Sequence, residues 1–252
     1  MNSENGQHLD ILHLDERMVA VNKPAGLPVV PLRSGRGASL RELLAGHLGE
    51  RPYVVHRIDR DTSGVVLFAR DSETHRALSR MFERREVEKT YLAVVRGNPS
   101  PAQGTIELPL ERDPHNPTRM TVVRKGGKPS RTDYRTLESY GGYAFLEVRP
   151  VTGRMHQVRV HLAAIGHPLA VDPIYGGAEA VYLSEFKRDY RRKKSCRERP
   201  LISRLSLHAC AVRLRHPLTG VDAVLFEAPL PHDLDVLLKQ LSRHASPPPG
   251  GR

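Results

Sequence analysis

The sequence predicts a strand-rich fold that also contains helices, and three of its features lead to that prediction. Short runs rich in β-branched and aromatic residues follow one another through the middle of the chain, separated by glycine-containing turns. Apolar residues at helical spacing occur on either side of that region. No repeat or linker composition divides the chain, so we expect one domain over residues 9–241, a disordered segment at 1–8 and a flexible tail at 242–252.

The predicted strands are recognised by composition and by the turns that end them. The first two form a hairpin joined at Asp15-Glu16, and residues 65–69 are apolar without interruption, which is typical of a strand buried on both faces. The predicted strands are residues 9–14, 18–22, 65–69, 89–96, 104–110, 120–123, 132–137, 143–148, 206–214 and 223–226.

Four helices are predicted from apolar stripes, and capping residues indicate their ends. Ser39 is expected to cap the first helix, and Asp71 or Ser72 the second. The third is expected to end where Gly166 can adopt the left-handed conformation, and Asp233 is expected to cap the fourth. The second helix carries four arginines off its apolar stripe, namely Arg76, Arg80, Arg84 and Arg85.

The charge balance favours a polyanionic partner. Lys and Arg number 39 against 28 Asp and Glu, a net charge of +11, and nucleic acid is the commonest partner for such a chain. No apolar run is long enough to span a bilayer and no secretory signal begins the chain, so we expect a cytoplasmic protein without membrane contact. Two cysteines make no disulfide framework and no zinc-binding pair.

A basic segment at residues 187–199 holds more than half of that net charge. Eight Lys and Arg residues stand there against Asp189 and Glu198, a net charge of +6. Such a run is either a solvated surface or an insertion that binds phosphate groups, and the sequence favours neither over the other.

The densest group of reactive side chains lies at residues 55–69. Asp59 and Asp61 alternate there with Arg57 and Arg60, beside His56 and two hydroxyl groups. A turn needs only Gly64 for its backbone, so this density indicates a site, although a surface loop with local ion pairs is the alternative. The 13 histidines show no metal-ligand spacing, and the serine before Gly64 lacks the context of a serine hydrolase.

Arg159 lies on a predicted helix, three residues after His156 and on the same face. If that face is directed to the core, the guanidinium needs a buried carboxylate, because an unpaired buried charge costs several kcal/mol. Asp59 is the candidate partner. A surface arginine lying over apolar neighbours is the alternative.

Four blocks of the sequence resemble the RluA family of RNA pseudouridine synthases in order and spacing. The second of them is similar to the family signature His-Arg-Leu-Asp-x-x-Thr-Ser-Gly, with Ile58 in place of leucine. The resemblance extends from about Leu9 to Pro229, and its blocks are Val19 to Gly26, His56 to Gly64, Lys89 to Tyr91, and Thr152 to Leu162 running on to Leu169.

The resemblance implies the α+β pseudouridine synthase fold, with a mixed, largely antiparallel central sheet, flanking helices and a central active-site cleft. It implies an isomerase that cleaves the C1′–N1 bond of a flipped-out uridine in structured RNA, turns the base and rejoins it through C5. By position, Asp59 matches the catalytic aspartate, Tyr91 the active-site tyrosine and Arg159 the arginine that pairs with the aspartate. Asp61 falls at a variable position, and we interpret it as an exposed ion-pair partner of Arg60.

The resemblance also implies contacts to the substrate, and no metal ion or organic cofactor. The residues that we expect to bind substrate are His56, Arg57, Thr62, Arg154 and His156. The expected partners are ribosomal RNA, transfer RNA or both, and we expect a monomer without an obligate protein partner. We expect no S4-type RNA-binding domain of the kind that many relatives carry. Ala170-Val171-Asp172 replaces the more common Val-Gly-Asp.

Two other functions stay open at this point. One is a catalytically silent RNA-binding protein of the same fold, which predicts salt-sensitive RNA binding without pseudouridine formation. The other is a metal-dependent phosphodiesterase that uses Asp59, Asp61 and His56, which predicts activity abolished by chelation.

Overall fold

The computed structural model describes residues 9–32, 37–176, 178–191, 197–217 and 223–245, and it contains two compact units. The first consists of Met1–Glu88 with Ala209–Pro229, and the second of Lys89–His208 with Leu230–Arg252. Both combine antiparallel strands with helices, so the α+β class is confirmed. That residues 9–241 form one domain stays a prediction.

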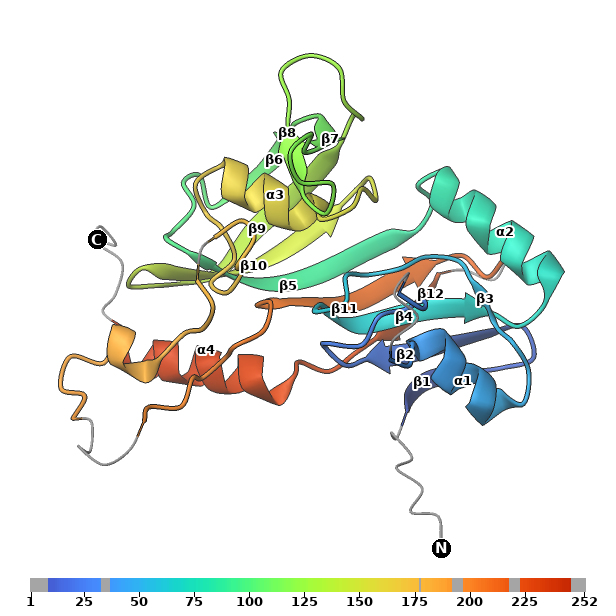
Figure 1. Ribbon diagram of the computed structural model, residues 1–252, viewed down its shortest axis with the longest axis horizontal. Helices are drawn as coiled ribbons and strands as arrows, with labels where there is room; N and C mark the ends of the chain where they lie inside the picture. The colour runs from blue at the N-terminus through green and yellow to red at the C-terminus, as the bar shows by residue number, and fades with distance from the viewer. Residues whose placement is uncertain (1–8, 33–36, 177, 192–196, 218–222, 246–252) are drawn as a thin grey trace, which may run out of the picture. The chain divides into compact units, whose positions relative to one another are not determined.

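The first unit is a sheet with the strand order β1-β2-β4-β11, in which β3 pairs with β4 and β12 with β11. Strands β2 and β4 are antiparallel, with Lys23 opposite Gly64, and α2 packs on β4 (Figure 1). Its elements are β1 (Asp10–Leu14), β2 (Met18–Lys23), α1 (Leu40–Leu48), β3 (Tyr53–Val54), β4 (Ser63–Ala69), α2 (Ser72–Glu83), β11 (Leu207–Leu214) and β12 (Val224–Glu227).

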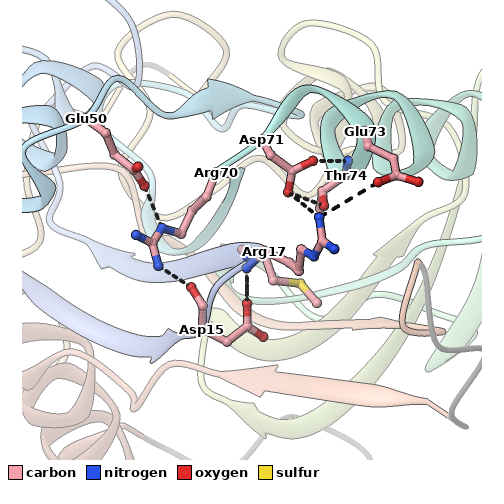
Figure 2. Close-up of polar contacts among 8 residues, drawn as sticks. Asp15, Arg17, Glu50, Arg70, Asp71, Glu73 and Thr74 are labelled. Carbon is pink, nitrogen blue, oxygen red and sulfur yellow. Dashed lines mark hydrogen bonds and ion pairs between the residues drawn. The ribbon is translucent and has the colours of Figure 1, made fainter.

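Both helices of this unit begin as the sequence predicts. Ser39 forms a capping box with Glu42, and the Asp71 carboxylate accepts a hydrogen bond from the backbone N–H of Thr74 at 2.8 Å. Figure 2 shows the contact between the start of α2 and the β1–β2 turn, where Arg17 lies 3.4 Å from the Asp71 carboxylate. These contacts hold α2 at the end of strand β4.

The second unit contains a sheet with the order β5-β10-β9-β6, a separate β7–β8 pair and two helices. Alternation along β5 sends Ala93 and Val95 towards α3 but Val94 towards α4, and the two helices lie on opposite faces of these strands (Figure 1). Its elements are β5 (Glu88–Arg96), β6 (Gln103–Glu107), β7 (Leu110–Arg112), β8 (Met120–Val122), β9 (Arg131–Tyr140), β10 (Tyr143–Pro150), α3 (Gln157–Ala164), the short 3₁₀ helix η1 (Leu183–Glu185) and α4 (His232–His244).

The end of α3 confirms the prediction made from its glycine. Gly166 has a φ of +84°, and its N–H donates to the Ala163 carbonyl at 3.0 Å. The next N–H, from His167, donates to Leu162 at 2.9 Å, so the last carbonyl groups of α3 are satisfied.

Two local predictions were wrong. The strand expected over residues 104–110 is interrupted after Glu107, since Pro109 has no N–H for a ladder, and the chain enters the β7–β8 pair at Leu110. Asp233 does not cap α4, whose N-cap is Pro231. The Asp233 carboxylate instead accepts hydrogen bonds from Arg204 at 2.6 and 2.7 Å, because a guanidinium is the stronger partner.

The predicted termini and insertion are described only in part. Helix α4 runs to His244, beyond the boundary expected at residue 241, while residues 1–8 and 246–252 lie outside the described residues. So do residues 192–196 of the basic segment. Beside that gap, Ser184 donates a hydrogen bond to Glu198 at 2.7 Å. Within the described chain, no helix is long and apolar enough to cross a membrane.

Candidate active site

In the first unit, Asp59 opens a tight turn that leads into β4. The N–H of Thr62 donates to the Asp59 carbonyl at 3.2 Å, and the Arg60 carbonyl accepts from the N–H of Gly26 at 2.9 Å. Asp59 itself is half-buried, whereas Arg60 and Asp61 at the tip of the turn are exposed. The backbone of this turn is therefore held to the loop after β2 while its tip faces solvent.

The side chain of Lys23 holds the backbone of this turn in place. Its side chain is fully buried, and its ammonium group donates hydrogen bonds of 2.8 Å to three carbonyl oxygens, those of Pro24, Leu27 and Arg60. An ammonium buried without partners would cost several kcal/mol, so this convergence of carbonyl groups is what permits the burial. Lys23 thereby joins the end of β2 to the residue that follows Asp59.

The two carboxylates of this turn have different surroundings. Asp61 is 52% exposed and lies 3.6 Å from the Nε of Arg60, which confirms that it is an exposed ion-pair partner. Gly64 is the second residue of the buried strand β4 and has a φ of +116°, and a Cβ there would lie 2.1 Å from the Ala209 carbonyl oxygen. Only glycine fits this close approach of β4 and β11, so the residue sets the position of the turn.

Three residues expected to bind substrate lie around this turn. The Nε2 of His56 accepts a hydrogen bond from the N–H of Leu67 at 2.9 Å, and its ring stacks on Phe82 at 4.7 Å between centroids. These contacts support the strand and α2. Arg57 is exposed, whereas Thr62 is 1% exposed and its hydroxyl has no hydrogen-bond partner among the described residues. Their contact with a substrate stays a prediction.

In the second unit, Arg159 is buried and paired with Asp172. The Arg159 side chain is 5% exposed and that of Asp172 is fully buried. The Nε and Nη2 of the guanidinium donate to the two carboxylate oxygens at 2.8 and 2.9 Å, a bidentate pair. Arg159 therefore faces the core and has a buried carboxylate partner, Asp172, while the pairing with Asp59 that we expect from the sequence stays a prediction.

Sequence reasoning assigned no role to Asp172 or to Tyr175. Asp172 also accepts hydrogen bonds from the N–H groups of Ile174 at 3.0 Å and Tyr175 at 3.2 Å, so it fixes the turn that carries Tyr175. The Arg159 guanidinium carbon lies 5.1 Å from the centre of the Tyr175 ring. The sequence signal that could have identified Asp172 as the buried partner of Arg159 is its place directly after the apolar run 169–171.

Tyr175 joins Arg159 to His156. Burial raises the pKa of the Tyr175 phenol, so the hydroxyl stays protonated at neutral pH. Its oxygen accepts a hydrogen bond from the N–H of Met120 at 2.8 Å, and the hydroxyl forms a second hydrogen bond with the Nδ1 of His156 at 2.9 Å. His156 is the N-cap residue of α3 with a φ of +53°, a conformation that costs free energy in residues other than glycine. The tyrosine bond holds it there.

The remaining candidates of the second unit lie near the start of α3 and on β5. Tyr91 is half-buried on β5, opposite Val148 of β10, beside the core cluster that contains α3. Arg154 has a buried Nε that lacks a hydrogen-bond partner within the described residues, which is unusual for a charged group. Gln157 fixes the backbone next to it, since its Oε1 accepts from the N–H of Arg154 at 3.0 Å.

Asp59 belongs to the first unit, and Tyr91 and Arg159 to the second. That these three side chains act on one nucleotide, with Arg159 paired to Asp59, stays a prediction. Within the described residues, no three His, Cys, Asp or Glu side chains are grouped so that they could hold a metal ion.

Comparison with known proteins adds an independent line of evidence. Residues 17–164 match the family described as RNA pseudouridylate synthase. The chain is 38% identical to ribosomal large subunit pseudouridine synthase D of Neisseria meningitidis over 94% of its own length, and it spans 62% of that protein. It is 37% identical to the dual-specificity RNA pseudouridine synthase RluA of Salmonella typhi, over 88% of this chain and 93% of that one. A solved structure, human RNA pseudouridylate synthase domain containing 1, matches with a TM-score of 0.68 at 26% identity, over 99% of this chain and 100% of that one.

Proposed function

Since this chain belongs to the RNA pseudouridylate synthase family, we propose that it isomerises uridine to pseudouridine in structured RNA, with Asp59 as its catalytic carboxylate. The family and the fold agree with the expectation from the four sequence blocks. The observation that carries the residue assignment is the unequal placement of the two acids: Asp59 is half-buried in a turn anchored by Lys23, while Asp61 is exposed beside Arg60.

The proposed reaction balances without a redox partner. The Asp59 carboxylate forms a transient bond to the nucleotide, and the C1′–N1 bond breaks. The uracil turns, C5 bonds to C1′, and the bond between Asp59 and the nucleotide breaks, which regenerates the carboxylate. The proton on C5 leaves while N1 gains a proton. Asp59 must be ionised for the first step, and a nearby guanidinium favours the ionised form. We assign that part to Arg159.

The other candidates have parts that their chemistry suits. Tyr91 presents a flat ring against which the uracil can lie, and its phenol can assist removal of the C5 proton. Arg57 is exposed beside Asp59 and can occupy the space that the flipped base leaves. Arg154, whose buried Nε lacks a partner among the described residues, suits a phosphate oxygen of the flipped nucleotide.

The substrate RNA is proposed by analogy with the relatives. One is named for the large ribosomal subunit and another for dual specificity, so ribosomal RNA, transfer RNA or both are the proposed substrates, in the cytoplasm. Sequencing that maps pseudouridine in total RNA from cells with and without the gene tests this directly. Loss of modified positions only in RNA of other classes would contradict the proposal.

The catalytic assignment is tested by tritium release from RNA labelled at uridine C5, in the presence of EDTA. Asp59→Asn is expected to release no tritium above background, because an amide cannot act as the nucleophile. Asp61→Asn is the matched control two residues away and is expected to keep the wild-type rate. Circular dichroism and RNA binding of both variants show that they are folded.

Three outcomes would contradict the assignment. Tritium release that survives in Asp59→Asn excludes this residue as the nucleophile. RNA binding without any release by the wild-type protein favours the catalytically silent alternative. Shortened RNA products that disappear on chelation favour the phosphodiesterase.

A further inference from the structure

Helix α2 has one apolar face and one arginine-rich face. Thr74 and Leu78 are buried, and Met81 and Phe82 pack against the core cluster of the first unit. Four arginines of α2 and of the two residues after it are exposed, and we call them the arginine face: Arg76, Arg80, Arg84 and Arg85. The only acid among residues 76–85 is Glu83, so this stretch has a net charge of +3.

The arginine face differs from the other arginines around α2 in having few partners. Arg17 is paired with Asp71 at 3.4 Å, and Arg70 with Glu50 at 2.6 Å (Figure 2). Within the described residues, neither Arg76 nor Arg80 makes an ion pair or a side-chain hydrogen bond, and Arg84 reaches Glu86 only at 4.0 Å. Asp71 and Glu73 lie at the start of α2, where they pair with Arg17, whereas Glu83 and Glu86 are the acids next to the arginine face in sequence.

Arg85 stands where the backbone favours glycine. It has a φ of +61° at the end of α2, and the N–H of Glu86 donates to the Met81 carbonyl at 2.9 Å, which is the pattern of a Schellman motif. Glycine is the usual residue at this position because a side chain is strained there. Within the described residues, Arg85 makes no ion pair or side-chain hydrogen bond that would offset this strain, which points to a use outside the chain.

We propose that the arginine face of α2 is a docking surface for the sugar-phosphate backbone of RNA. Arg76, Arg80 and Arg84 follow one another at intervals of four residues, so they lie on one side and about 6 Å apart along the axis. Such a row matches a run of phosphates, and each guanidinium can bind a phosphate with two hydrogen bonds. The identity of the polyanion as RNA rests on the proposed function.

A simpler explanation of the arginine face makes different predictions. Cations near the C-terminus of a helix interact favourably with its dipole, and a charged exposed face keeps the protein soluble. In that case substitution lowers the stability of α2 slightly and leaves RNA binding unchanged. The docking surface predicts weaker RNA binding with the stability of α2 unchanged, so binding and stability are measured on the same variants.

The first experiment measures the binding of a fluorescein-labelled 30-nucleotide RNA stem-loop by anisotropy, over a series of KCl concentrations. Each phosphate contact contributes a factor of [salt] to the power of about −0.7, which is about fivefold at 0.1 M. The double variant Arg76→Ser/Arg80→Ser is expected to raise the Kd about 25-fold at 0.1 M KCl. It should also reduce the slope of log K against log[KCl] by about 1.4.

The matched control is Arg17→Ser, since Arg17 is also an exposed arginine close to α2 but is paired with carboxylates. It is expected to change neither the Kd nor the salt slope. An unchanged slope in Arg76→Ser/Arg80→Ser would overturn the proposal, and so would an equal change in Arg17→Ser. If Arg76→Ser/Arg80→Ser instead weakened binding to phosphatidylserine vesicles and left RNA binding intact, the surface would be assigned to a membrane, and this would also overturn the proposal.

Arg85→Gly distinguishes a role of Arg85 in RNA binding from a role in the stability of α2. Glycine relieves the left-handed strain, so the melting temperature is expected to stay the same or rise while the Kd for the stem-loop rises about fivefold at 0.1 M KCl. Arg85→Gly with wild-type affinity contradicts a role for this residue. All of these assays measure binding alone, so they decide the docking surface even if the wild-type protein releases no tritium. Conversely, unchanged binding leaves the proposed isomerase function standing.

Discussion

Asp172→Ala tests whether the buried pair with Arg159 holds the second unit together. The substitution leaves a guanidinium that is 5% exposed without the carboxylate that takes two of its hydrogen bonds. Breaking a buried ion pair from one side costs about 3–5 kcal/mol. The N–H groups of Ile174 and Tyr175 also lose their acceptor, at about 1 kcal/mol each. The expected loss in the free energy of unfolding is therefore about 5–7 kcal/mol.

A double variant distinguishes the charge from the packing. Arg159→Met/Asp172→Leu removes both charges and fills a similar volume, and such replacements of buried pairs are often neutral or stabilising. We expect it to be about 3 kcal/mol more stable than Asp172→Ala, because no buried charge is left uncompensated. Both variants should be inactive in tritium release, since neither holds a guanidinium in place.

Urea denaturation followed by tyrosine fluorescence and by circular dichroism measures these differences. The reasoning is refuted if Asp172→Ala lies within 1 kcal/mol of the wild-type protein, or if the double variant is no more stable than Asp172→Ala. Wild-type activity in the double variant would refute the assignment of Arg159 to the reaction.

Further predictions concern three buried positions. Gly64→Ala should lower the free energy of unfolding, measured in urea, by about 3 kcal/mol or more, because its Cβ would lie 2.1 Å from the Ala209 carbonyl oxygen. The control is Gly49→Ala, which has a φ of +70° and open space around its Cβ and should lose only about 1 kcal/mol. Lys23→Met removes one hydrogen-bond donor from each of three carbonyl groups, of which the Arg60 carbonyl keeps the N–H of Gly26. We expect a loss of about 3 kcal/mol in the free energy of unfolding and a lower kcat in tritium release, and unchanged stability would contradict this. Burial lowers the pKa of His161 below its ordinary 6.5, so the unfolded chain binds a proton first as the pH falls. Stability should therefore decline as the pH drops below about 6.5, and urea titrations of His161→Asn should show a flatter dependence on pH.

Local signals were sufficient to predict much of the secondary structure. Ser39 and Asp71 cap their helices, and Gly166 ends α3, because each of these roles depends on backbone groups only a few residues away. Asp233 carried the same kind of signal and failed, since a guanidinium distant in sequence competes for its carboxylate. A capping preference of about 1 kcal/mol does not outweigh such a pair.

The sequence singled out candidate residues for the site, but it did not reveal the groups that hold them in place. Motif spacing singled out Asp59 and Arg159, and the charge pattern correctly gave Asp61 to Arg60. Asp172 could be found only from the fold, because which carboxylate reaches a buried guanidinium depends on how α3 packs against the chain that follows it. The same holds for Lys23, whose three acceptors are carbonyl groups without a side-chain signature.

Lys23 and Asp172 have comparable roles, because Lys23 supports the turn of Asp59 and Asp172 holds the side chain of Arg159. Each is a fully buried charge from another segment that fixes the backbone or the side chain of the residue expected to meet the substrate. A carboxylate and a guanidinium held in this way need little reorganisation when charge develops on the nucleotide, which is where electrostatic catalysis gains most. Substitutions at these two supports should therefore lower kcat more than they raise KM, whereas substitutions on the arginine face of α2 should act mainly on KM.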